Sequence, residues 1–171
     1  MLPVFCEDIL GDATLFPWLV STTAFGAMLG ALATGRDARP TLDRSALRLC
    51  FYGLAFGVFA SSALVAAPLG GAALRAAFVV AFVSQFVVGY FYFAVMTSLQ
   101  TLIQQLVDDA SRGRVMSLFQ VAWGGLTPVG ALGMGALATV VGIEITLQVS
   151  AVACVVSGAL IRRHALRPPH D

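Results

Sequence analysis

The chain has 171 residues, of which 58% are hydrophobic and 11% are charged, and its mean hydropathy is +0.88. A soluble domain carries roughly 25% charged residues, so an excess of apolar residues on this scale requires an apolar solvent, which the bilayer supplies. The formal net charge of +1 provides no electrostatic attraction to nucleic acid, and we expect no nucleic-acid partner.

Five apolar stretches follow one another along the chain, and a helix of about 20 such residues crosses a bilayer. They are residues 16–35, 47–67, 72–107, 115–141 and 143–161. The stretches are continuous rather than alternating, which favours helices over the strands of a membrane barrel. The sequence predicts an all-α integral membrane protein of about five transmembrane helices, with the lipid bilayer as its solvent and one partial bundle over residues 1–171.

The arginines predict how the helices are oriented, because basic residues concentrate on the cytoplasmic side. Only Arg75 lies on the opposite side of the expected bundle. The others lie at alternate ends of the spans: Arg36, Arg39, Arg44, Arg48, Arg112, Arg114, Arg162, Arg163 and Arg167. The C-terminus is therefore expected in the cytoplasm and the N-terminus outside. All basic residues are arginine, which is typical of a high-GC bacterial genome and indicates a bacterial inner membrane.

Ionisable residues are missing from the middle of every expected span, although such residues usually mark proton or ion pathways. The histidines, His164 and His170, both lie in the C-terminal tail. No Ser/His/Asp set, paired carboxylates or metal-ligand spacing is present. We expect no enzyme activity, no metal and no cofactor.

Polar residues within the spans are candidates for lining a substrate cavity. Gln85, Tyr92 and Gln120 are the best candidates, because they lie away from the cytoplasmic ends. The alternative is that each forms an ordinary hydrogen bond between helices.

Two stripes of small residues recur at helical spacing. One comprises Gly26, Gly30 and Thr34, and the other Ala131, Gly135 and Thr139. Small residues allow helix backbones to approach closely, so both stripes predict packing surfaces. A sliding gate surface is the functional alternative.

The fourth span contains a proline, which removes a backbone hydrogen bond and bends or loosens a helix. We expect a helix joint formed by Gly125, Thr127, Pro128 and Gly130. Many structural membrane helices also carry proline, so the joint need not be functional.

Residues 104–118, QQLVDDASRGRVMSL, resemble the loop between the tenth and eleventh helices of the major facilitator superfamily, in its enterobactin-exporter-like branch. The residues from Gly125 to Gly130 are similar to the eleventh helix of that branch, and residues 2–11 are similar to the loop after its seventh helix. The resemblance implies that the five spans are helices eight to twelve of a twelve-helix transporter. It also implies a cytoplasmic gate loop of Asp108, Asp109, Arg112, Gly113 and Arg114, for which simple membrane anchoring by arginine is the alternative.

The resemblance implies a function in secondary active export of small amphipathic molecules, such as siderophores or drugs. Such transporters bind substrate between two helical halves, so the chain is expected to be inactive alone. We expect it to be a fragment that meets a missing N-terminal half, or to self-associate. The alternative function is that of a structural or regulatory membrane protein that binds a partner and transports nothing.

Overall fold

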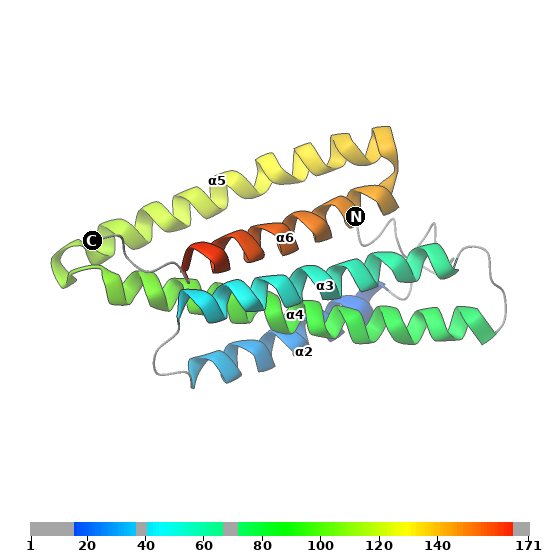
Figure 1. Cartoon of the computed structure of the whole chain (residues 1–171), viewed down its shortest axis with the longest axis horizontal. Coiled ribbons are helices and arrows are strands. Elements are labelled where there is room, and N and C mark those ends of the chain that lie inside the picture. Colours follow the sequence, from blue (N-terminus) through cyan, green and yellow to red (C-terminus); the bar gives the residue numbers. More distant parts are fainter. Residues whose placement is uncertain (1–15, 37–40, 67–71, 166–171) are drawn as a thin grey trace.

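The computed structural model describes residues 16–36, 41–66 and 72–165. These residues form α2 (Phe16–Gly35), α3 (Leu42–Ala66), α4 (Ala72–Leu106), α5 (Asp109–Val141) and α6 (Ile143–Ala165). Consecutive helices run in opposite directions (Figure 1). All five are long and apolar enough to cross a membrane, which confirms the predicted all-α membrane fold.

Helix α2 coincides with its expected span and α4 ends one residue short of its own. Helices α3 and α5 begin before their expected spans and α6 ends after its span, because charged residues limit a membrane span but do not end a helix. Asp43 and Asp109 lie in the first turns of α3 and α5, and Arg162 and Arg163 lie in the last turn of α6. These positions are favourable, since acids suit a helix N-terminus and bases suit its C-terminus. At about 1.5 Å per residue, the 35-residue α4 is longer than the hydrocarbon core of a bilayer is thick.

Four of the helices form a packed row in the order α2, α4, α3, α6. The fifth, α5, lies along the outside of this row (Figure 1) and contacts mainly α6 and, less extensively, α4. No residue of α5 is buried. The structure is therefore a tightly packed four-helix unit with one helix largely uncovered.

Glycines make the contact between α2 and α4 unusually close. A Cβ atom added at Gly26 or Gly30 would overlap the backbone carbonyl oxygen of Phe86 or Tyr90, and one added at Gly89 would overlap that of Thr23. The two backbones therefore touch directly. The stripe that contains Gly26 and Gly30 is a packing surface, as its spacing predicts.

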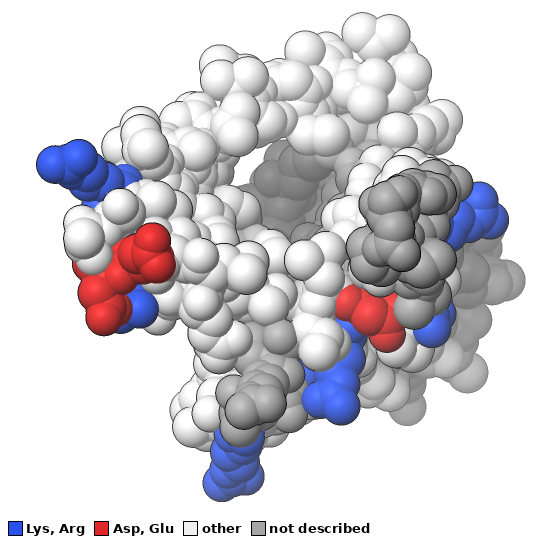
Figure 2. Space-filling model, turned by 60° about the vertical axis from the view of Figure 1, so that its left-hand side comes forward, with Lys and Arg blue, Asp and Glu red and all other residues white. Residues whose placement is uncertain are grey.

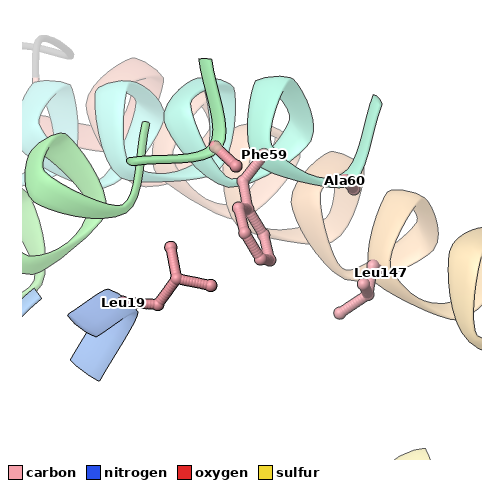
Figure 3. Close-up of a cluster of buried hydrophobic side chains, with 5 residues drawn as sticks. Leu19, Phe59, Ala60 and Leu147 are labelled. Carbon is pink, nitrogen blue, oxygen red and sulfur yellow. The ribbon is translucent and has the colours of Figure 1, made fainter. Parts of the chain in front are cut away.

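A cluster of buried apolar side chains joins all four packed helices. Figure 3 shows Leu19 of α2, Phe59 and Ala60 of α3 and Leu147 of α6 pointing into it, and Ala81 of α4 completes the cluster. Partly buried phenylalanines, including Phe16 and Phe56, pack around these residues.

The turn between α5 and α6 consists of a single residue, Gly142. Its φ of +88° lies in the region where glycine carries no steric penalty. Its N–H donates to the carbonyl of Ala138 at 3.1 Å, and its own carbonyl accepts from the Thr146 hydroxyl at 2.8 Å.

Arginines whose side chains are described gather at one end of the bundle, where α2 and α6 end and α3 and α5 begin. Figure 2 turns this end toward the viewer and shows charged groups spread around it, with a hollow among uncharged residues. Arg162 donates to Asp43 at 2.9 Å, and Arg48 donates to the buried Ser98 hydroxyl at 2.6 Å. Segment 2–11 lies outside the described residues, as do Arg39 and Arg167.

Candidate functional site

A pocket of about 170 Å³ lies between α4 and α5, near the end at which the two helices are joined. Its lining consists of Tyr92, Phe93, Met96 and Gln100 from α4, and Phe119, Gln120 and Trp123 from α5. Two of the three predicted cavity residues, Tyr92 and Gln120, thus line one pocket although they lie on different helices.

Helical spacing explains why these side chains converge. Residues 92, 96 and 100 are four apart, as are 119 and 123, and residues three or four apart share a helix face. The connection between the helices consists only of Val107 and Asp108, so the two faces meet close to it. The pocket is a consequence of the antiparallel pairing of α4 with α5.

Aromatic rings form most of the wall and continue inward to α3. The ring centroids of Tyr92 and Trp123 lie 6.4 Å apart, and Tyr92 meets Phe93 edge to face at 5.4 Å. Behind the pocket, Tyr52 lies 6.0 Å from Tyr92 and stacks on Phe56. Aromatic pairs at these separations attract one another, so Tyr92 is held in place from α3.

The third predicted cavity residue, Gln85, is not in this pocket. It is 3% exposed and lies seven residues before Tyr92, or about two helical turns, on the face of α4 that carries the buried Ala81 and Val88. The structure therefore places it among packed helices, where hydrogen bonding between helices is the usual role of a polar side chain.

The segment that was expected as a cytoplasmic gate loop is helical from Asp109 onward, so its description as a loop is wrong. The carbonyl of Asp108 accepts from the N–H groups of Ser111 and Arg112, both at 3.0 Å, which starts α5. Arg112 pairs with Asp109 at 2.7 Å, one turn apart, with both side chains well exposed. Gly113 and Arg114 lie in the same exposed stretch.

The expected helix joint lies within an unbroken helix, because α5 continues through Pro128. The Thr127 hydroxyl donates to the carbonyl of Trp123 at 2.7 Å, not to that of Gly124, which proline leaves without its helical donor. Among the described atoms, none lies within 4 Å of a Cβ added at Gly125 or Gly130. Neighbouring helices therefore do not restrain this part of α5, and its role as a joint stays a prediction.

Trp123, Phe119 and Met96 line the pocket but were not predicted from the sequence. Their spacing was the available signal. Trp123 lies three residues after Gln120 and Phe119 lies one before it, and Met96 lies four residues after Tyr92. Apolar side chains at such positions are common on every face of a membrane helix, so only the pairing of α4 with α5 distinguishes these.

The five long apolar helices define a multi-pass membrane protein. The family model of the Major Facilitator Superfamily matches residues 1–171. The chain belongs to this superfamily, whose members are membrane transporters. No curated protein and no solved structure matches the chain significantly.

Proposed function

We propose that the chain forms part of a secondary active exporter of small amphipathic molecules of siderophore or drug type, and that substrate binds in the pocket between α4 and α5. The pocket is the observation that carries this proposal. It combines four aromatic rings with two amides, and an apolar site with a few convergent polar groups is typical of small-molecule binding. The resemblance of residues 104–118 to the enterobactin-exporter-like branch supports export as the direction.

A second helical bundle covers α5 in this proposal. Large apolar side chains on α5 are exposed, among them Leu118, Leu132 and Val140 at 68%, 75% and 82%. Alternating access moves two bundles against each other around a shared site, and α5 supplies one wall of that site. The four packed helices would then move as one body, with α5 between the two bundles.

The proposed orientation places the arginine-rich end of the bundle in the cytoplasm of a bacterial cell. The positive-inside rule supports this orientation, and the Asp109–Arg112 pair then lies at the cytoplasmic mouth beside the pocket. Gln120 lies eight residues beyond Arg112 on the same helix, which corresponds to about 12 Å along its axis.

The test is export of a fluorescent amphipathic dye from cells that make the chain. Deleting the gene should raise dye retention, and expressing the native chain should restore export. Gln120→Leu should fail to restore it, because the variant keeps the side-chain size but removes a polar group from the pocket wall.

Gln104→Leu is the matched control, since Gln104 is exposed and does not line the pocket. It should restore export as the native chain does, at equal membrane abundance. Equal export by both variants, or unchanged dye retention after gene deletion, would contradict the proposal.

A further inference from the structure

We propose that the pocket between α4 and α5 selects an uncharged, planar aromatic molecule that carries an amide-like hydrogen-bonding edge. This inference rests on the proposed function, because it names the class of molecule that the same pocket binds. It follows from three properties of the lining: its charge, the arrangement of its rings and the state of its two amides.

The lining contains no carboxylate, arginine, lysine or histidine among the residues that the structure describes. The pocket's nearest charged neighbour along α5 is Arg114, six residues before Gln120, or about 9 Å along the helix axis. Arg48 lies on the other side of α4, where it donates to Ser98. An ionised ligand would lose its hydration without gaining an opposite charge, which is strongly unfavourable.

The rings favour a flat ligand. Tyr92 and Trp123 come from opposite walls, with their planes inclined at 47°, and Phe119 lies one turn before Trp123 on the same wall. Aromatic faces and edges attract another aromatic ring by stacking or edge-to-face contact. The volume of about 170 Å³ suits a single substituted ring, so of a larger amphipathic substrate the pocket would hold one aromatic group.

The two amides favour a ligand with both a donor and an acceptor. Gln100 and Gln120 reach the pocket from opposite helices, and each amide offers one carbonyl acceptor and an NH₂ donor. Neither amide has a hydrogen-bond partner within the described part of the chain, and neither is sealed from the surface. An amide-like group between them could accept from one and donate to the other.

Three probes of the same shape distinguish the possible charges: 4-nitrobenzamide is neutral, 4-nitrobenzoate is an anion and 4-nitrobenzamidinium is a cation. The nitro group quenches tryptophan fluorescence on contact. The chain has two tryptophans, and Trp18 is 68% exposed on α2, so Trp18→Phe leaves Trp123 as the only reporter. The purified full chain is titrated with each probe in lipid nanodiscs.

Trp123→Phe is the matched control, because Trp18 then reports only how much probe enters the bilayer. After this correction, 4-nitrobenzamide should quench Trp123 saturably, with half-saturation at a concentration at least about tenfold below that of either charged probe. Adding Gln100→Leu and Gln120→Leu to the Trp18→Phe chain should weaken binding of the neutral probe about tenfold.

Tighter binding of the anion or the cation would overturn the inference and leave the proposed function standing with a different substrate class. Saturable binding of the neutral probe that is unaffected by the two leucine substitutions would overturn the role of the amides. Absence of saturable quenching by all three probes would also overturn the inference. A different result contradicts the proposed function: dye export that is the same with Gln120→Leu as with the native chain.

Discussion

The two small-residue stripes of the chain have opposite surroundings. On α2, Gly26 and Gly30 lie directly against the backbone of α4, and nothing larger than glycine fits there. On α5, a Cβ added at Gly135, the glycine of the second stripe, meets no described atom within 4 Å, and the same holds at the nearby Gly130 and Gly133. Spacing alone does not separate the two stripes, since both provide small residues at helical intervals.

The difference shows how the bundle divides into a rigid part and an open part. Glycine contacts join α2 to α4, and they also join α3 to α6, where Gly53 and Gly158 face the opposite backbone. The same residue type on α5 faces open space. We infer that glycine on α5 is available for a contact that forms with another helical unit.

The largest expected effect concerns the α2–α4 contact. Gly30→Ala should lower the free energy of unfolding by about 1–3 kcal/mol, because the new methyl group overlaps the carbonyl of Tyr90 and the backbones must separate. Unfolding of the purified chain in mixed micelles by increasing SDS measures this change.

Gly135→Ala provides the matched control on α5. It adds the same methyl group in open space, so the free energy of unfolding should change by less than about 0.5 kcal/mol. Equal losses in the two variants would contradict the division into a rigid and an open part.

The fold was largely predictable from the sequence, because a bilayer imposes a simple length rule on apolar stretches. The charged ends of α3, α5 and α6 were not. The rule finds the lipid-embedded part, whereas Asp109 and Arg162 belong to helical turns beyond it. Dipole effects and capping favour these turns, and hydropathy does not detect them.

The candidate site was only partly predictable. Tyr92 and Gln120 were selected as polar residues away from the arginine-rich end, and the structure places them in one pocket. Gln85 met the same criterion but is buried among helices. Gln85 and Tyr92 are seven residues apart and so lie on nearly the same face of α4. The distinction depends on which helix covers that face at each level, and a single sequence contains no direct record of helix pairing.

An intermediate effect is expected at the α3–α6 contact, which combines close packing with hydrogen bonds. Gln148 donates to the Ser61 hydroxyl at 2.9 Å and to the Gly57 carbonyl at 3.3 Å. Gln148→Leu removes both bonds and should lower the free energy of unfolding by roughly 0.6–1.7 kcal/mol. The same SDS titration measures it, with Gln104→Leu as the exposed control. A loss of the same size in the control would show that glutamine removal itself is responsible.

A smaller effect is expected at the arginine-rich end of the same contact. Asp43→Asn removes the charge that pairs with Arg162, but both side chains are more than a third exposed. Exposed ion pairs contribute less than about 1 kcal/mol, so the free energy of unfolding should fall only slightly. The loss should shrink as salt is raised, because salt screens exposed charges. A large, salt-independent loss would show that the pair is part of the rigid packing.

The smallest effect on the isolated chain is expected on α5, where Leu132→Ala should leave the free energy of unfolding unchanged within about 0.5 kcal/mol. Leu132 is 75% exposed, so its removal leaves no cavity.

In native membranes the same position should lie against the second bundle. A photoreactive residue at 132 should therefore crosslink to peptides of another transmembrane helix, identified by mass spectrometry. The matched control is position 79 on α4, where Val79 is 62% exposed but lies in the rigid unit beside α3, and it should yield lipid adducts. Lipid adducts alone at both positions would show that α5 faces the bilayer, and its open glycines would then have no partner.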